Sequence, residues 1–225
     1  MILASVVGMP RGPRILPSAA MLHLICRGNN GMRVFRNRND FTQFALTLKR
    51  FTKESSLFIH HYVLMHTHVH LLAWCEDTSG MAQLIKAMNL SYHYYYARKY
   101  RYRGHLWHSR YRSVVIEDEP HWLQCGRYIE LNPVFAGMRR FPDDFPWSSY
   151  HYYAHGKYDA LMRPIMHPNG LPLHKPGKAN AGYREFIYAG IDLDYQLLKK
   201  RYEAGQVQKN EQIDCNNSQS PFIRK

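Results

Sequence analysis

The sequence lacks the features that mark membrane proteins and secreted disulfide scaffolds. No apolar run reaches the ~18 residues that span a bilayer, and the apolar residues 1–8 lack the positive start of a signal peptide. The four cysteines include no C-x-x-C pair, which argues against a disulfide framework and against a zinc finger beside the histidines. We therefore expect no membrane partner and reduced thiols in a cytoplasm.

Acidic residues are also scarce. Asp and Glu total 17 against 30 Lys and Arg, so the 225-residue chain has a formal net charge of +13. Residues 1–53 hold nine basic residues and one acid, and residues 98–112 hold six basic residues and no acid. The second stretch interleaves its charges with Tyr and Trp, a mixture that suits phosphates and unstacked bases. This pattern predicts a nucleic-acid partner, the alternative being a solvated basic face without a ligand.

The order of hydrophobic patterns predicts one α+β domain. Strands are expected at 19–26, 57–65, 68–74 and 111–116. Helices are expected from an Asp40 cap to Lys53, from a Thr78 or Ser79 cap, and from an Asp118 cap to Leu131. The order β-α-β-β-α-β plus one helix is typical of a ferredoxin-like antiparallel sheet, with its first and third strands central. Beyond it we expect loops over 164–182, helices over 183–191 and 194–204, and disorder from about 206.

Two histidines on the third predicted strand are the clearest chemical feature. His68 and His70 alternate along the strand, so both side chains project from one face of the sheet. A pair of neutral imidazoles on a central strand makes half of a divalent-metal site. A chance pair of histidines in this position is the alternative that the pair by itself leaves open.

The helix after the fourth strand presents a second group of polar residues. His121, Cys125, Tyr128 and Asn132 are spaced so that they share one face. A phenol with a pKa of ~10 is a weak nucleophile unless a metal and a bound phosphodiester favour its ionised form. Spacing alone does not separate this role from simple packing of Tyr128. A Cys125 thiol activated by His121 is a further alternative, less suited to a phosphodiester.

Several ordered blocks resemble the single-tyrosine HUH transposases, a family named for a histidine–hydrophobic–histidine motif. Residues 68–70 read HVH, and residues 104–113 read GHLWHSRYRS, similar to the family's G-x-L-W-x-x-R-[YF]-[KR]-S segment. Residues 127–134 read RYIELNPV and residues 146–150 read PWSSY, as in the family, and RGNN at 27–30 fits too. The likeness runs from about residue 9 to residue 150 and is strongest to the REP-associated tyrosine transposases, which act on repetitive extragenic palindromes.

The resemblance implies a function and a site. His68 and His70 would bind Mg²⁺ or Mn²⁺ with Asn132 as third ligand, and Tyr128 would attack DNA to leave a 5′-phosphotyrosine and a free 3′-OH. The substrate would be single-stranded DNA palindromes or hairpins, cleaved and rejoined during transposition in the bacterial cytoplasm at the nucleoid. DNA contacts are expected from these residues: Arg11, Arg14, Arg27, Asn29, Arg101, Arg103, Trp107, Arg110 and Arg112.

The sequence departs from the family's pattern at three places. Residues 65–67 read MHT where the family usually has M-P-N, so the metal geometry could be looser or His66 could add a ligand. Phe135 replaces a usual Arg, which removes one expected DNA contact. Gly126 lies inside the helix two residues before Tyr128, at a cost of roughly 0.5–1 kcal/mol relative to Ala, and suggests some mobility of this helix.

Other functions stay open from the sequence. The same topology occurs in RNA-recognition modules, although these carry aromatic residues where the third strand has histidines. An inactive relative that only binds hairpins is compatible with every residue above. The tyrosines at 92 and 94–96 could supply a second nucleophile, as in a two-tyrosine initiator. A homodimer and a monomer are both compatible with the sequence. We divide the chain into a basic arm (1–18), a transposase domain (19–150) and a C-terminal extension (151–225).

Overall fold

A computed structural model describes residues 15–162 and 178–191 of the chain. Arg11, Arg14, Cys215 and the helix expected over 194–204 lie outside these residues, as do most of the loop expected over 164–182 and the tail from 206.

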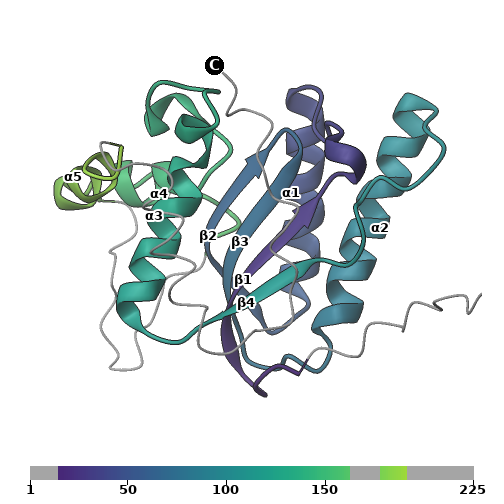
Figure 1. The fold of residues 1–225 in the computed structure, drawn as a ribbon, viewed down its shortest axis with the longest axis horizontal. Helices are drawn as coiled ribbons and strands as arrows, with labels where there is room; N and C mark the ends of the chain where they lie inside the picture. Colours follow the sequence, from purple (N-terminus) through teal and green to yellow (C-terminus); the bar gives the residue numbers. More distant parts are fainter. Residues whose placement is uncertain (1–14, 163–177, 192–225) are drawn as a thin grey trace, which may run out of the picture.

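The centre of the molecule is a four-stranded antiparallel sheet with the order β2-β3-β1-β4 (Figure 1). The strands are β1 (Ala20–Arg27), β2 (Leu57–Met65), β3 (His68–Cys75) and β4 (Arg112–Ile116). Strands β1 and β3 are central, as the topology predicts. Residues 66 and 67 form the tight turn between β2 and β3. The prediction of a ferredoxin-like α+β fold is therefore confirmed.

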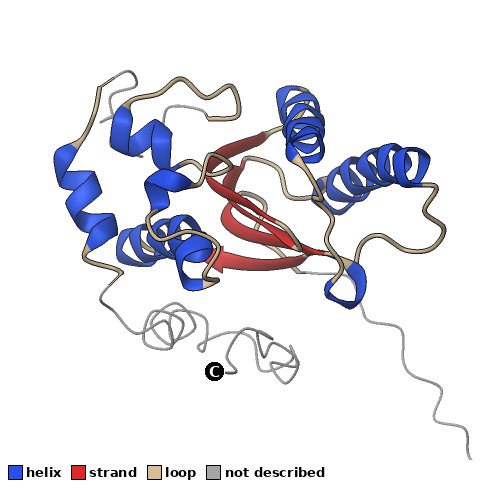
Figure 2. Cartoon of the chain, turned by 90° about the horizontal axis from the view of Figure 1, so that it is seen from above, coloured by secondary structure: helices blue, strands red, loops and turns tan. Residues whose placement is uncertain are grey.

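Helices cover both faces of this sheet, which Figures 1 and 2 show from two directions. Helices α1 (Arg38–Lys53) and α2 (Met81–Tyr100) pack side by side on one face. Helix α3 (Glu119–Phe135) packs on the other face against β2 and β3. Beside α3 lie two shorter helices, α4 (Tyr150–His155) and α5 (Ala181–Tyr188), and single 3₁₀ turns occur at Asn29–Gly31 and Pro142–Asp144.

Three helix ends differ from their predicted positions. Helix α1 is capped by Asn37, and Asp40 instead returns its carboxylate to the Asn37 backbone N–H, completing a capping box. Helix α2 begins after Gly80 without a side-chain cap, because Thr78 donates its hydroxyl to the Pro17 carbonyl. Helix α3 is capped by Asp118 as predicted but continues through Pro133 to Phe135. Tertiary packing of this last turn outweighs the local preference of proline to end a helix.

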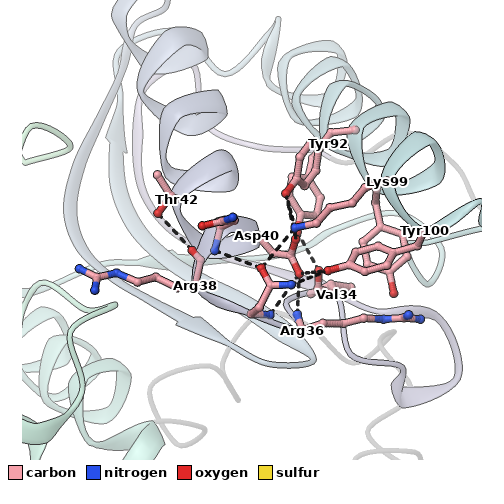
Figure 3. A network of polar contacts seen from close by, with 12 residues as sticks. Val34, Arg36, Arg38, Asp40, Thr42, Tyr92, Lys99 and Tyr100 are labelled. Carbon is pink, nitrogen blue, oxygen red and sulfur yellow. Dashed lines mark hydrogen bonds and ion pairs between the residues drawn. The ribbon is translucent and has the colours of Figure 1, made fainter.

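The tyrosine-rich part of α2 has a structural role. Asp40 is fully buried and accepts hydrogen bonds from Tyr95, Lys99 and Tyr100 (Figure 3). Hydroxyls of two neighbours on α2 reach backbone carbonyls of the segment before α1, Tyr92 to Val34 and Tyr96 to Arg33. Of the four candidate tyrosines, Tyr92, Tyr95 and Tyr96 have engaged hydroxyls and Tyr94 is 64% exposed. All four belong to α2, on the opposite face of the sheet from α3, which argues against a second nucleophile there.

Candidate functional site

Strand β3 presents His68 and His70 on the face of the sheet that α3 covers. Their rings lie 4.9 Å apart between centroids. Antiparallel pairing places Arg27 of β1 opposite His68 and Ile25 opposite His70, and Arg112 of β4 lies opposite Ile25. The histidine pair therefore has arginine side chains on its own face of the sheet.

Helix α3 brings Tyr128 to the same face. The Tyr128 ring lies 5.8 Å from the His70 ring and 6.3 Å from the His23 ring, with both pairs close to perpendicular. Tyr128 is partly buried, and α3 packs on the sheet of its own chain. One chain thus brings together the two predicted HUH histidines and the predicted tyrosine.

His23 of β1 joins this group, and the sequence analysis missed it. Its Nε2 lies 2.8 Å from His70 Nδ1, within hydrogen-bond distance, and the two rings stack at 5.0 Å. In the register, His23 faces Leu72, one side-chain position along from His70 on the same face. The alternation of side chains along β1 indicated on which face of the sheet His23 lies. The register that makes His23 and His70 neighbours could not be read from the sequence.

The three histidines are held in their neutral form. Burial, followed by the charges of His121 and Arg112, lowers the pKa of His23 to about 3. Burial and the nearby Arg27 lower the pKa of His68 to about 3, and burial with the neighbouring histidines and arginines lowers the pKa of His70 well below its usual value. Neutral imidazole is the form that binds a metal ion.

The arrangement of His70 fits a metal ligand. Its Nε2 is buried and has no hydrogen-bond partner among the described residues, whereas its Nδ1 faces His23. With the proton on Nδ1, Nε2 keeps a lone pair, and a hydrogen bond from the far nitrogen is what holds most metal-binding histidines in place. Within residues 15–162 and 178–191, no group of three or more His, Cys, Asp or Glu side chains is arranged to hold a metal ion, so the histidine pair has no third ligand of these types there.

Asn132 lies one helical turn beyond Tyr128. Its side chain is buried, and Nδ2 donates to the Tyr128 carbonyl at 2.7 Å. This hydrogen bond fixes the orientation of the amide. The amide oxygen takes no part in it, and oxygen is the atom that a hard cation prefers. The assignment of Asn132 as third ligand stays a prediction.

His66 is directed elsewhere. Its Nδ1 lies 3.0 Å from the Phe35 carbonyl, and its ring packs edge-on against Phe41 of α1. These contacts give the unusual histidine of the β2–β3 turn a packing role and do not support the suggestion that it adds a metal ligand.

The basic segments predicted to touch DNA meet beside the histidines. Backbone hydrogen bonds join Gly28 to Thr67, Asn29 to Leu106 and His108 to Arg27. A Cβ on Gly28 would lie 2.4 Å from the Met32 carbonyl, so only glycine permits this close approach. The arginines of the prediction that the structure describes are all exposed, namely Arg27, Arg101, Arg103, Arg110 and Arg112. Asn29 is partly buried. Their contacts with DNA stay a prediction.

Trp107 has contacts within the protein. Its indole is partly buried between Phe44 and Tyr92, at 5.9 and 6.0 Å between ring centroids, and Nε1 donates to the Asn89 carbonyl. These contacts explain the tryptophan by packing, and its use as a surface on which DNA bases stack stays a prediction.

Cys125 shares the helix face of Tyr128 but is unsuited to nucleophilic attack. Burial raises the pKa of its thiol well above the usual value, so the thiolate is disfavoured. Gly126 next to it has a packing reason: an added Cβ would lie 2.8 Å from the His61 ring of β2. The glycine therefore lets α3 approach the sheet closely, which replaces the expectation that it gives the helix mobility.

Comparison with known proteins identifies the family. Residues 18–132 match the model of the family described as transposase IS200 like. Among solved structures, one described as a REP-associated tyrosine transposase bound to a REP hairpin is similar, with a TM-score of 0.53 and 16% identity over 74% of this chain and 100% of that one. A search of curated proteins found no match. No helix in the described part of the chain is long and apolar enough to cross a membrane. Because the matched segment is more than half of the chain, this protein belongs to the IS200-like transposase family.

Proposed function

We propose that this transposase cleaves and rejoins single-stranded DNA hairpins, with Tyr128 as its nucleophile. The observation that carries the proposal is the placement of the Tyr128 ring 5.8 Å from His70, a residue whose buried Nε2 has no hydrogen-bond partner among the described residues. Family membership supplies the reaction class, and the site supplies the residues that would perform it.

His68, His70 and Asn132 are the residues that would hold Mg²⁺ or Mn²⁺. Bound there, the ion would polarise the scissile phosphate and reduce the pKa of a nearby phenol. The depressed pKa values of His68 and His70 keep both imidazoles available as ligands at any physiological pH.

Tyr128 would carry out the covalent step. Its phenolic oxygen attacks phosphorus, the P–O3′ bond breaks, and the phenolic proton is balanced by a proton taken up by the leaving 3′ oxygen. The products are a 5′-phosphotyrosine and a free 3′-OH. Attack of a 3′-OH on the phosphotyrosine reverses these bond changes, so strands are rejoined without an external energy source.

The substrate class is supported by charge. Arg27 and Arg112 are exposed and lie beside the histidine pair on the same face of the sheet, and arginines there suit a DNA backbone. The similar structure described above contains a REP hairpin, and we propose hairpins of palindromic sequence as the target here. We propose that the protein acts on chromosomal repeats and therefore works in the bacterial cytoplasm at the nucleoid.

A cleavage assay tests the proposal. End-labelled single-stranded palindromic DNA is incubated with Mn²⁺ or with a chelator, and covalent protein–DNA adducts are separated on a denaturing gel. We expect a metal-dependent adduct with the wild type and with Tyr94→Phe, whose tyrosine is 64% exposed on α2, and none with Tyr128→Phe. Hairpin binding without an adduct in the wild type would instead establish an inactive hairpin-binding protein.

A further inference from the structure

Glu130 of α3 lies close in sequence to Tyr128 but on the opposite side of the helix from it, and its contacts are with other residues than His68 and His70. The carboxylate is fully buried. Its Oε1 lies 3.0 Å from Nδ1 of His61 on β2 and accepts from the Ser149 hydroxyl at 2.6 Å. Its Oε2 accepts from the Tyr183 hydroxyl of α5 at 2.7 Å. Glu130 therefore joins the tyrosine helix to the sheet, to the residue before α4 and to α5.

Arg127 makes a second connection between α3 and α5. Its guanidinium donates to the Phe186 carbonyl at 3.3 Å and lies 4.5 Å from the centre of the Phe186 ring. Just after α5, a Cβ on Gly190 would lie 2.7 Å from the Leu131 side chain, so the backbone there rests directly on α3. Helix α5 therefore contacts the tyrosine helix through Arg127 and Glu130, which lie on either side of Tyr128 in the sequence.

The angular position of Glu130 on α3 relates its contacts to the placement of Tyr128. Successive residues of a helix are about 100° apart, so Glu130 lies about 200° round the axis from Tyr128. A side-chain tip about 6 Å from the axis moves about 1 Å when the helix rolls by 10°. Contacts that fix Glu130 therefore fix how closely the Tyr128 hydroxyl approaches the histidines, and a 1 Å misplacement can slow a reaction about 100-fold.

We propose that Tyr183, acting through Glu130, is a positioning residue that sets the roll of α3 and aims Tyr128 at the His68–His70 pair. This inference rests on the proposed function of Tyr128. Helix α5 lies beyond the segment that matches the family model, so a residue of the C-terminal extension would position the nucleophile that the matched segment carries.

The structure offers a matched control in the same helix. Tyr188 of α5 donates to Asp143 at 2.6 Å, and Tyr150 and His155 of α4 bond the same carboxylate. Tyr183→Phe and Tyr188→Phe each remove one hydroxyl that bonds a carboxylate, but only the first bond ends on α3. If α5 served stability alone, the two variants would behave alike.

The first test compares both variants in single-turnover adduct formation with saturating hairpin DNA and Mn²⁺. We expect Tyr183→Phe to slow adduct formation about 10- to 100-fold with unchanged DNA affinity, and Tyr188→Phe to stay within about twofold of the wild type. Equal rates for the two variants, or a loss of rate in Tyr183→Phe explained by weaker DNA binding, would overturn the proposal.

A second measurement separates this inference from the proposed chemistry. Hydrogen exchange of the amides of residues 127–132 is followed in the DNA-free protein, where no cleavage is needed. We expect faster exchange in Tyr183→Phe than in Tyr188→Phe, even if the wild type forms no adduct. Equal protection in the two variants would show that Tyr183 does not restrain α3, whatever the outcome of the cleavage assay.

Discussion

His23 Nε2 and His70 Nδ1 lie 2.8 Å apart, between two central strands of the sheet and next to Tyr128. This contact uses Nδ1 of His70, the nitrogen on the other side of the ring from the buried Nε2, which has no hydrogen-bond partner among the described residues. The contact thereby holds the His70 imidazole in one orientation, and we expect His23 to influence the site through His70.

We predict that His23→Ala weakens Mn²⁺ binding about 10- to 100-fold, because loss of a partner to the far nitrogen of a metal-binding histidine has effects of this size. Electron paramagnetic resonance of free Mn²⁺ measures the affinity without DNA. His105→Ala, at an exposed histidine, should leave the affinity unchanged. Equal affinities for His23→Ala and the wild type would refute the role.

Because α3 packs on its own sheet, one chain should supply a whole site. A mixture of His70→Ala and Tyr128→Phe chains then contains no complete site, and we expect no adduct from it in the cleavage assay. Adduct formation by the mixture, with neither variant active alone, would show that chains exchange α3 in a dimer.

Gly126→Ala should destabilise the fold by about 1–2 kcal/mol despite the better helix propensity of alanine. The added Cβ would lie 2.8 Å from the His61 ring, which is stacked on Tyr153 and has little room to move. Urea unfolding gives the free energy. Gly182→Ala in α5 is the control, since its Cβ meets only Asn180 at 3.6 Å, and it should be neutral or slightly stabilising.

Asp40→Asn should cost roughly 2 kcal/mol at neutral pH, because the buried carboxylate loses its charged hydrogen bond with Lys99, whose side chain is 28% exposed. Burial raises the pKa of Asp40, but hydrogen bonds from Lys99, Tyr100, the Arg36 backbone and Tyr95 outweigh burial and lower the net value. The stabilisation is therefore complete above the unfolded pKa of about 3.9 and is lost as pH falls through the lower folded pKa.

Urea unfolding of wild type and Asp40→Asn at pH 7, 5 and 3.5 checks this dependence. The difference in unfolding free energy should be equal at pH 7 and 5 and begin to shrink at pH 3.5. Asp144→Asn, at an exposed carboxylate, should change stability by less than about 0.5 kcal/mol. A difference for Asp40→Asn that stays constant down to pH 3.5 would contradict the depressed pKa.

Arg112→Ala should weaken binding of hairpin DNA about 3- to 10-fold and reduce the salt dependence of the affinity by about one counterion. The side chain is exposed on the strand beside β1, on the face that carries the histidines. Fluorescence anisotropy at several salt concentrations gives both numbers. Lys53→Ala, at the far end of α1, should change neither, and equal effects of the two variants would argue against a localised DNA contact.

Local patterns predicted the parts of this protein that depend on periodicity. Alternation along β3 was enough to place His68 and His70 on one face, and helical spacing was enough to align Tyr128 with Asn132. The order of the elements predicted the sheet topology, since few arrangements satisfy that order.

Contacts that depend on register and on distant segments were not predictable in this way. The His23–His70 pair requires knowledge of how β1 aligns with β3. The bond between Glu130 and Tyr183 joins residues 53 positions apart, and nothing in either local sequence names its partner. Gly126 looked like a flexible point because the His61 ring that forbids a side chain there lies on another element.

The tyrosines of α2 contact Asp40 of α1 and the segment before α1, and these contacts have one more consequence. Arg33 and Arg36 are exposed, yet the backbone that carries them is held by Tyr96, Tyr92 and Asp40. The Arg36 guanidinium also lies 4.4 Å from the centre of the Tyr100 ring. Ordering a loop costs about 1–2 kcal/mol per residue in conformational entropy. Here that cost is met during folding, so a polyanion arriving at these arginines would find its binding surface already arranged.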